Sequence, residues 1–323
     1  MPASHPAVSV VVATHNRCAR LERLFAGLRS QSVGLAAFEV IVVDDGSTDA
    51  TSEVLDREKA RGELQLKVIR RAASSGPAAA RQEGWRAASA PLIAFTDDDC
   101  VPTPGWLAVG IGAWNKEPDS IIQGRTEPDP SERDELGPFS RTIELTSYYP
   151  AFNTCNIFYS RAILERIGGF DIDAFDRAPG GEDCDLGWRA IKAGGEPRFV
   201  DDALVYHAVD RVGALGMLRV AARWTTPMKA FARHPELREA IFVRRYFWKL
   251  EHYWLTCALI ALVLPRSLWW LRIPLSYRYV RNLWARGRVI GGGPGLAPYY
   301  FALDLVETVA VARGGIRYRT PML

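Results

Sequence analysis

Short apolar runs alternate with amphipathic segments along the first third of the chain. Four of these runs are rich in β-branched and aromatic residues, which is typical of buried strands. We expect the strands at residues 8–13, 38–43, 64–70 and 92–96. Strands that alternate with helices predict right-handed crossovers and a mainly parallel sheet with helices on both faces. The pattern therefore predicts an α/β fold.

Three polar residues stand just before segments whose composition predicts a helix: Asn16, Ser47 and Ser160. Side chains of Asn and Ser accept hydrogen bonds from the free amides of a first helical turn, so we expect each to be an N-cap. Residues 126–138 are rich in Pro, Asp and Glu and are expected to form a surface loop. Further helices are expected at residues 78–88 and 182–193.

Three of the expected strands lead directly into polar clusters, which are residues 14–17 (THNR), 44–45 (DD) and 97–99 (DDD). The carboxyl ends of parallel strands lie at one edge of a sheet, where α/β proteins bind their ligands. Topology alone therefore predicts that the three clusters lie together and form a binding site.

The run Asp97, Asp98 and Asp99 places three carboxylates side by side, where they repel one another unless a positive charge offsets the repulsion. A hard divalent cation such as Mg²⁺ or Mn²⁺ does this, because it prefers oxygen ligands and bridges to phosphate. The alternative is a solvated acidic turn or a helix N-cap. The apolar strand directly before the run favours the metal site.

A second acidic pair, Glu182 and Asp183, follows Gly180 and Gly181 at the head of an expected helix. The helix dipole and free amides keep a carboxylate ionised there, and an ionised, oriented carboxylate can act as a general base. The alternative is that these acids only cap and solvate the helix. His207, at the end of a late strand, is either a metal ligand or a satisfied histidine. Cations that would neutralise a phosphate, or else lie exposed, are Arg17, Arg70, Arg71 and Arg81.

Six segments, taken in order, resemble the inverting family 2 glycosyltransferases, which have the GT-A (Rossmann-like) fold. The segments are VSVVVATHNR (8–17), FEVIVVDDGSTD (38–49), SSGPAAARQEGW (74–85), LIAFTDDDCVP (92–102), GGEDCDLGWR (180–189) and YHAV (206–209). The resemblance covers about residues 8–207. It implies transfer of a sugar, with inversion, from a nucleoside-diphosphate sugar to a hydroxyl acceptor, with a divalent metal (Mn or Mg) as cofactor. UDP is the nucleotide that it favours.

The resemblance also implies a role for each matching position. It places the donor nucleotide against Ala13, Asn16, Arg17, Asp45, Gly76, Arg81, Asp97 and Asp98. It assigns the metal to Asp99 and His207, the catalytic base to Asp183, and the acceptor or sugar to Gly181 and Glu182. Processive relatives carry a QxxRW element, whereas residues 220–224 (VAARW) have the RW without the Gln. We therefore expect a non-processive enzyme that adds one or a few sugars.

Two other functions are compatible with the same fold. A sugar nucleotidyltransferase would need a Gly-rich basic loop after the first strand, whereas that loop is ATHNRC and has no glycine. A non-catalytic carbohydrate- or lipid-binding protein would not need the acidic residues at 97–99 and 183, which are all present. Both alternatives are therefore weaker than the glycosyltransferase.

The net charge of +3 hides a strong asymmetry between two regions. Residues 1–218 carry 23 basic and 32 acidic side chains, and residues 219–323 carry 17 and 5. We expect a catalytic domain in the first region and a helical, apolar and basic C-terminal region in the second. Because its basic residues alternate with apolar runs, the second region favours a membrane surface over nucleic acid as a partner.

The apolar run at residues 253–264 is shorter than the roughly 20 residues of a membrane-spanning helix. Trp269 and Trp270, with nearby arginines, suit a membrane–water interface, although a buried helix of a C-terminal subdomain is the alternative. Asp304 and Glu307 argue against a span at residues 296–312.

The five cysteines are odd in number, widely spaced and without a CxxC pair, which indicates neither a disulfide framework nor a zinc site. The N-terminal residues have no charged segment followed by an apolar one, so no signal peptide is expected. We expect a cytoplasmic protein on the inner face of the cell membrane. Synthesis of envelope or surface glycans, with a lipid-linked compound as one candidate acceptor, fits this location.

Overall fold

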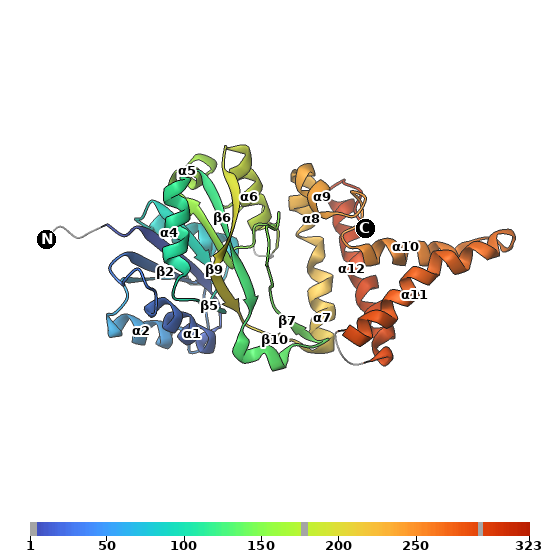
Figure 1. Cartoon of the computed structure of the whole chain (residues 1–323), viewed down its shortest axis with the longest axis horizontal. Helices are drawn as coiled ribbons and strands as arrows, with labels where there is room; N and C mark the ends of the chain where they lie inside the picture. The colour runs from blue at the N-terminus through green and yellow to red at the C-terminus, as the bar shows by residue number, and fades with distance from the viewer. Residues whose placement is uncertain (1–4, 176–179, 290–292) are drawn as a thin grey trace. The chain divides into compact units, whose positions relative to one another are not determined.

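The computed structural model describes residues 5–175, 180–289 and 293–323. The chain forms two compact units (Figure 1). The first consists of Met1–Arg133 and Thr142–Val209, and the second of Asp134–Arg141 and Asp210–Leu323. The functional division that we expect between residues 218 and 219 stays a prediction.

The first unit is organised by a sheet whose eight described strands follow the order β3-β2-β1-β4-β8-β6-β9-β5. Their bounds are β1 Val8–Thr14, β2 Phe38–Asp44, β3 Leu66–Arg70, β4 Leu92–Thr96, β5 Cys100–Pro102, β6 Ser120–Pro128, β8 Asn156–Ser160 and β9 Glu196–His207. Pairing is parallel for β1 with β2 and β4, for β2 with β3, and for β6 with β9. It is antiparallel where β8 joins β4 and β6, and where β5 joins β9. The predicted α/β fold with a mainly parallel sheet is confirmed.

Helices cover both faces of this sheet (Figure 1). They are α1 Cys18–Arg29, α2 Thr51–Arg61, α3 Pro77–Ala87, α4 Trp106–Lys116, α5 Arg161–Ile167 and α6 Glu182–Lys192. Val10 and Val12 of β1 belong to the core that α1, α2 and α4 cover. Val11 points to the other face, where it packs against Gly84 of α3 so closely that a Cβ atom there would lie 2.5 Å away. Strand residues alternate between faces, and a sheet that is covered on both sides therefore needs an uninterrupted apolar run.

Only one of the three predicted N-caps is found. The Ser160 hydroxyl accepts a hydrogen bond from the Ile163 amide at 3.2 Å, which confirms the prediction for α5. The predictions for Asn16 and Ser47 are wrong, because α1 begins at Cys18 and α2 at Thr51 without a side-chain cap. Instead, the Asn16 amide donates to the Ser47 hydroxyl at 2.9 Å. The two residues thus bond to each other across two loops, and neither bonds to the first turn of the helix that follows it.

The prediction of a surface loop at residues 126–138 is wrong in part. Strand β6 continues to Pro128, and residues Pro130–Glu135 form a 3₁₀ helix. Arg23 of α1 pairs with Asp129 and Glu132, and the Val209 amide donates to Glu132 at 2.8 Å. These tertiary contacts order an acidic segment whose composition alone predicts a loop.

The second unit is helical apart from a short antiparallel pair, β7 Ser140–Arg141 and β10 Asp210–Arg211. Its α-helices are α7 Gly213–Ala222, α8 Met228–Arg233, α9 Pro235–Ile241, α10 Leu250–Val263, α11 Arg272–Val289 and α12 Ala297–Arg317. Helix α12 packs against α7, α8, α10 and α11. A small core of Leu255, Tyr279, Leu283 and Tyr300 joins α10, α11 and α12.

Two buried acidic residues of α12 are each paired with a cation. Asp304 accepts from Arg286 at 2.8 Å and from the Tyr279 hydroxyl at 3.0 Å, and Glu307 accepts from Lys249 at 2.8 Å. The stretch Pro294–Arg317 meets the length and composition of a membrane span, with a mean hydropathy of 1.2 over an 18-residue window, although the two acids predict none. Of that window, 33% is buried.

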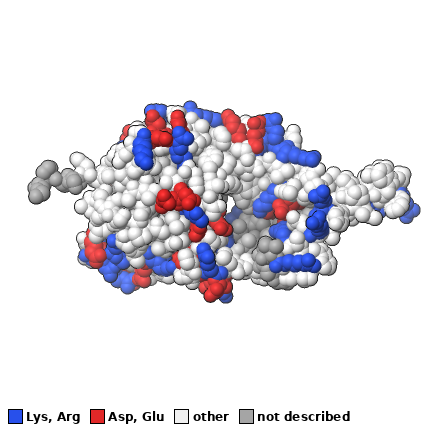
Figure 2. All heavy atoms as spheres, viewed as in Figure 1, with Lys and Arg blue, Asp and Glu red and all other residues white. Residues whose placement is uncertain are grey.

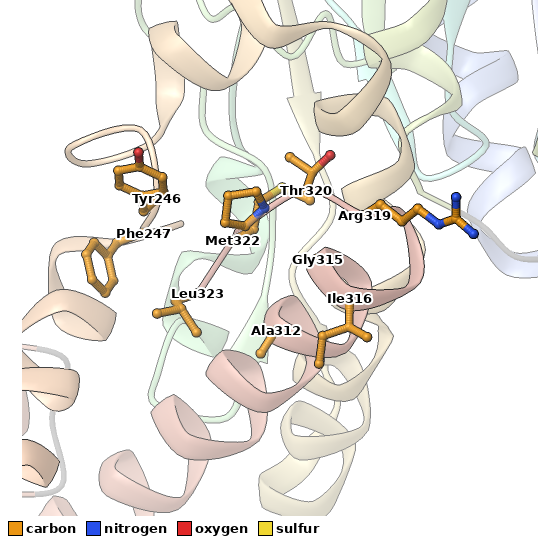
Figure 3. A pocket seen from close by; sticks show the side chains of 10 residues that line it. Tyr246, Phe247, Ala312, Gly315, Ile316, Arg319, Thr320, Met322 and Leu323 are labelled. Carbon is orange, nitrogen blue, oxygen red and sulfur yellow. The ribbon is translucent and has the colours of Figure 1, made fainter.

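An apolar cavity of about 640 Å³ lies at the C-terminal end of α12 (Figure 3). Its lining includes Phe247, Ile316, Met322 and Leu323, with Arg319 as the charged member. None of the predicted site residues belongs to this cavity.

Candidate functional site

The three polar clusters predicted to lie together do so. Strands β1, β2 and β4 are mutually parallel, and their carboxyl ends therefore share one edge of the sheet. The His15 ring lies 2.9 Å from the Asp45 carbonyl through Nδ1, and the Asn16 side-chain oxygen accepts from the Thr48 amide at 2.8 Å. Asn16 has a positive φ of 56°, which Asn tolerates better than most residues. The loops after β1 and β2 are thus tied to each other, and Ala13 lies directly before them on β1.

Asp45 is the best-satisfied carboxylate of this edge. It accepts hydrogen bonds from the Ser74 hydroxyl at 2.7 Å, the Ser75 amide at 3.1 Å and the Gly76 amide at 2.9 Å. Arg71 contacts the Oδ1 atom of Asp45, which the Ser75 amide also contacts, at 3.2 Å. Gly76 adopts a φ of 93°, in the region that favours glycine, and this turn directs the loop amides at Asp45. The structure therefore joins two predicted nucleotide-binding positions, Asp45 and Gly76, in one contact.

The three aspartates after β4 point to different partners. Asp97 lies 2.6 Å from Arg81, whereas Asp98 and Asp99 face Arg17 at 4.0 and 3.6 Å. Burial, together with repulsion from Asp99, raises the pKa of Asp98 to about 7. The raised pKa shows that Arg17 and the Thr14 hydroxyl do not offset the combined effect of burial and the charge of Asp99.

Arg81 connects the two acidic clusters that the sequence places far apart. Its guanidinium group bonds Asp97 at the end of β4 and lies 3.4 Å from Glu182 at the start of α6. The side chain is buried, and burial alone would lower its pKa; Asp97 and Glu182 outweigh burial and raise it. The planar guanidinium group of Arg81 therefore links the aspartates at 97–99 to α6, the helix that carries Asp183.

Asp183 lies in the first turn of α6. Gly181 has a φ of 93° just before this helix, and Glu182 turns back to accept from the Gly180 amide at 2.7 Å. Desolvation, reinforced by the adjacent Glu182 and opposed by Arg81, raises the pKa of Asp183 to about 7. A carboxyl group whose pKa is near neutrality is suited to accept a proton under physiological conditions.

Asp99, Cys100 and His207 could hold a metal ion, since one ligand atom from each lies within 4.8 Å of the others. His207 Nε2 is 3.5 Å from Asp99, while its Nδ1 lies 2.9 Å from the Ala208 carbonyl. That carbonyl favours a proton on Nδ1 and leaves Nε2 as the free ligand. Burial raises the pKa of the Cys100 thiol well above its ordinary value, which disfavours a thiolate ligand and leaves the carboxylate of Asp99 and the imidazole of His207 as the preferred donors. This set fits Mn²⁺ or Mg²⁺ better than a thiolate-preferring ion.

Some of the site residues were not assigned from the sequence. Cys100 pairs with His207 across the antiparallel β5–β9 contact, which no local pattern reveals. Ser74 and Ser75 lie in a matched segment, but only their contact with Asp45 indicates a role. Of the four candidate arginines, Arg70 does not join the site, because it pairs with Asp56 on the surface at 2.6 Å.

The mainly parallel sheet with helices on both faces and an acidic cluster at its carboxyl edge matches the GT-A fold of solved glycosyltransferases. A mannosyltransferase from Pyrobaculum calidifontis, solved with GDP-Man and Mn²⁺, has this fold with a TM-score of 0.59 at 20% identity, covering 97% of this chain and 88% of its own. TarS of Staphylococcus aureus, solved with UDP-GlcNAc, gives a TM-score of 0.54 at 18% identity and covers 97% and 92%. The chain belongs to Glycosyl transferase family 2, whose profile matches residues 9–171.

Curated relatives agree with this family. A validoxylamine A glucosyltransferase of Streptomyces hygroscopicus is 32% identical in an alignment 230 positions long, which covers 60% of this chain and 53% of that protein. A pre-mycofactocin glycosyltransferase of Mycobacterium tuberculosis is 31% identical in an alignment 219 positions long, which covers 63% of this chain and 43% of that protein. The chain thus spans about half the length of these relatives.

Proposed function

We propose that the protein is a metal-dependent, inverting glycosyltransferase that moves a sugar from a nucleoside diphosphate to a hydroxyl acceptor without processive polymerisation. The observation that carries the proposal is the bridge through Arg81 from Asp97 to Glu182, which places two acidic clusters at one site. Such enzymes need one acidic cluster beside the donor diphosphate and another carboxylate beside the acceptor.

The donor side of the site is formed by the ends of β1, β2 and β4. Asp45 and Gly76 would hold the base, Ala13, Asn16 and Arg17 the rest of the nucleoside diphosphate, and Asp97 the ribose. The support for a nucleotide sugar is that structural neighbours were solved with GDP-Man and with UDP-GlcNAc. We favour UDP as the nucleotide.

Asp99 and the Nε2 atom of His207 would hold the divalent cation. When bound, a divalent cation supplies positive charge that offsets the negative charge growing on the diphosphate leaving group. Arg17, which faces Asp98 and Asp99, would approach the oxygens of the diphosphate as well. The cation and Arg17 would therefore offset the negative charge of both the aspartates and the diphosphate.

Asp183 would act as the base on the acceptor side, beside Gly181 and Glu182. Its carboxylate takes the proton of the acceptor hydroxyl while that oxygen bonds to the anomeric carbon. The bond from this carbon to the diphosphate oxygen breaks, and its electron pair leaves with the nucleoside diphosphate. Attack from the side opposite the leaving group inverts the anomeric centre.

The proposal is tested with purified full-length protein, UDP-glucose, UDP-GlcNAc and GDP-mannose, each with and without Mn²⁺. We expect one donor to be hydrolysed slowly to free nucleoside diphosphate, and only with the metal. Donor binding without turnover would indicate a non-catalytic protein. Formation of pyrophosphate from a sugar phosphate and a nucleoside triphosphate would indicate a nucleotidyltransferase.

We also propose that the protein works on the cytoplasmic face of the cell membrane, in envelope or surface glycan synthesis. Support comes from the composition of the second unit, which is basic and rich in exposed aromatic residues. A lipid-linked acceptor fits such a location. Recovery of the full-length protein in the soluble fraction, without detergent, would contradict this part of the proposal.

A further inference from the structure

The outer part of the α10–α11 hairpin exposes an unusual number of large apolar side chains. Helices α10 and α11 pack against each other, and their outer ends, with the 3₁₀ helix Arg266–Leu271 between them, extend beyond the other helices of this unit (Figure 1). Within residues 259–273, the large apolar side chains exposed by more than half are Leu262 (74%), Val263 (81%), Trp269 (63%), Trp270 (57%) and Ile273 (67%). A patch of this kind marks an interaction site.

Helix α10 is apolar on all sides rather than on one. Its inner half has a protein environment, since Leu255 is buried against Tyr279 and Tyr300. Its outer half has no such protein environment among the described residues, because Ile260 and Leu262 remain exposed. A helix that is apolar all round is found inside a core or inside a lipid bilayer. The outer half of α10 therefore calls for a second apolar environment.

The charges around this patch point to an anionic partner. Residues 252–303 contain six arginines and neither Asp nor Glu. Arg266, Arg272, Arg278 and Arg281 are exposed, and Figure 2 shows the outer hairpin as largely uncharged with basic side chains at its far end. A second copy of this chain would bring the same positive charges to the contact, where they repel. An anionic lipid surface attracts them.

We propose that the segment Leu259–Ile273 inserts into one leaflet of an anionic membrane. This deepens the proposed membrane location and does not depend on the sugar-transfer chemistry. The rise from Leu259 to Val263 is about 6 Å. That is comparable with the roughly 5–10 Å reached by interfacial helices and far short of the ~30 Å hydrocarbon core. The tip enters the interface and does not cross the membrane, with Trp269 and Trp270 at the level of the headgroups.

The test uses co-sedimentation of the full-length protein with vesicles made of equal parts phosphatidylglycerol and phosphatidylcholine. The variant carries Leu262→Ser, Trp269→Ser and Trp270→Ser, all at exposed positions. We expect its partition coefficient to fall at least tenfold below that of the unaltered protein. The matched control is Leu215→Ser, which removes another exposed leucine of the same unit (61%) and should bind as before.

Charge is tested separately with Arg266→Glu and Arg281→Glu. We expect this double variant to lose its preference for the anionic vesicles over pure phosphatidylcholine. Equal thermal unfolding midpoints show that each variant is folded, and donor-dependent stabilisation with Mn²⁺ reports on the first unit independently.

Three results would overturn the inference. If the triple variant binds vesicles as the unaltered protein does, the membrane location stands and the tip has no part in it. If the unaltered protein binds no vesicles, both proposals fall. If sedimentation shows instead a dimer that the triple variant dissociates, the patch is an interface between two copies.

Discussion

The two units differ in how completely their buried acidic side chains are paired. In the second unit, Asp304 accepts hydrogen bonds from Arg286 and Tyr279, although burial still raises its pKa, and Glu307 accepts from Lys249. Burial works against the charge of Glu307, yet contacts with His252 and Lys249 hold its pKa below the ordinary value. In the first unit, burial and like charge raise the pKa values of Asp98 and Asp183 to about 7. Removing one partner of a buried pair is destabilising, because it leaves an uncompensated charge, whereas carboxyl groups with raised pKa values that converge at one edge of a sheet are candidates for a functional site.

The largest effect should come from the proposed base. Asp183→Asn keeps the shape of the side chain but cannot accept the proton, so we expect kcat to fall by about 10²–10⁴-fold. Donor binding, measured by thermal shift with Mn²⁺, should be largely retained. Asp202→Asn, an exposed aspartate on β9, is the matched control. An Asp183→Asn enzyme with full activity would refute the assignment.

On the opposite side of the comparison, Glu307→Gln should lower the free energy of unfolding by about 2 kcal/mol, because contacts with Lys249 and His252 stabilise the ionised form of this buried carboxylate. Chemical denaturation measures this change. Glu239→Gln removes one partner of the exposed pair with Arg245 and should change stability by less than about 0.5 kcal/mol. Equal effects of the two substitutions would show that burial of the pair does not matter.

The metal ligands can be separated from the base by titration with Mn²⁺. For Asp99→Asn we expect the Mn²⁺ concentration for half-maximal activity to rise at least tenfold, since a carboxylate ligand is lost. His207→Gln should act in the same direction with a smaller effect. Unchanged Mn²⁺ dependence in both variants would exclude this pair as the metal site.

The raised pKa of Asp183 predicts the pH dependence of transfer. The carboxyl group must be ionised to accept a proton, and it is protonated below its pKa. With a pKa of about 7, kcat/KM should rise with pH through that value and level off above it. A profile that is flat between pH values of about 5 and 8 would contradict a base with this pKa.

The smallest effect should be a gain in stability at the acidic edge. Asp98 is buried beside two other carboxylates, so Asp98→Asn removes repulsion and is expected to stabilise the protein by about 1 kcal/mol while it impairs donor binding. Thermal unfolding with and without the donor measures both. A loss of stability instead would place Asp98 among the paired acids, like Glu307.

The sequence predicted what depends on local pattern. The strands at 8–13 and 92–96 could be found because both faces of the sheet are covered and the runs are uniformly apolar. Parallel pairing then placed Asn16, Asp45 and Asp97 at one edge without any coordinates.

What the sequence could not give depends on contacts between distant segments. The polar end of β6 forms a strand because Gly124 and Thr126 pair with β9 across a bulge, which a Pro- and Glu-rich stretch does not reveal. Asn16 and Ser47 are not caps because they meet each other, and either one alone suits a helix start. The bridge from Arg81 to Glu182 likewise exists only in three dimensions.

The Arg81 bridge also limits how pH can affect activity. Arg81 is held ionised by Asp97 and Glu182 at any pH at which the protein is folded, so its charge forms a constant background to the reaction. Protons can therefore adjust activity only through other groups, of which the carboxyl groups of Asp98 and Asp183 have pKa values of about 7. A lysine in its place would be a point charge without the planar fork of a guanidinium group. The single side chain that now contacts both Asp97 and Glu182 would then no longer set the distance between them.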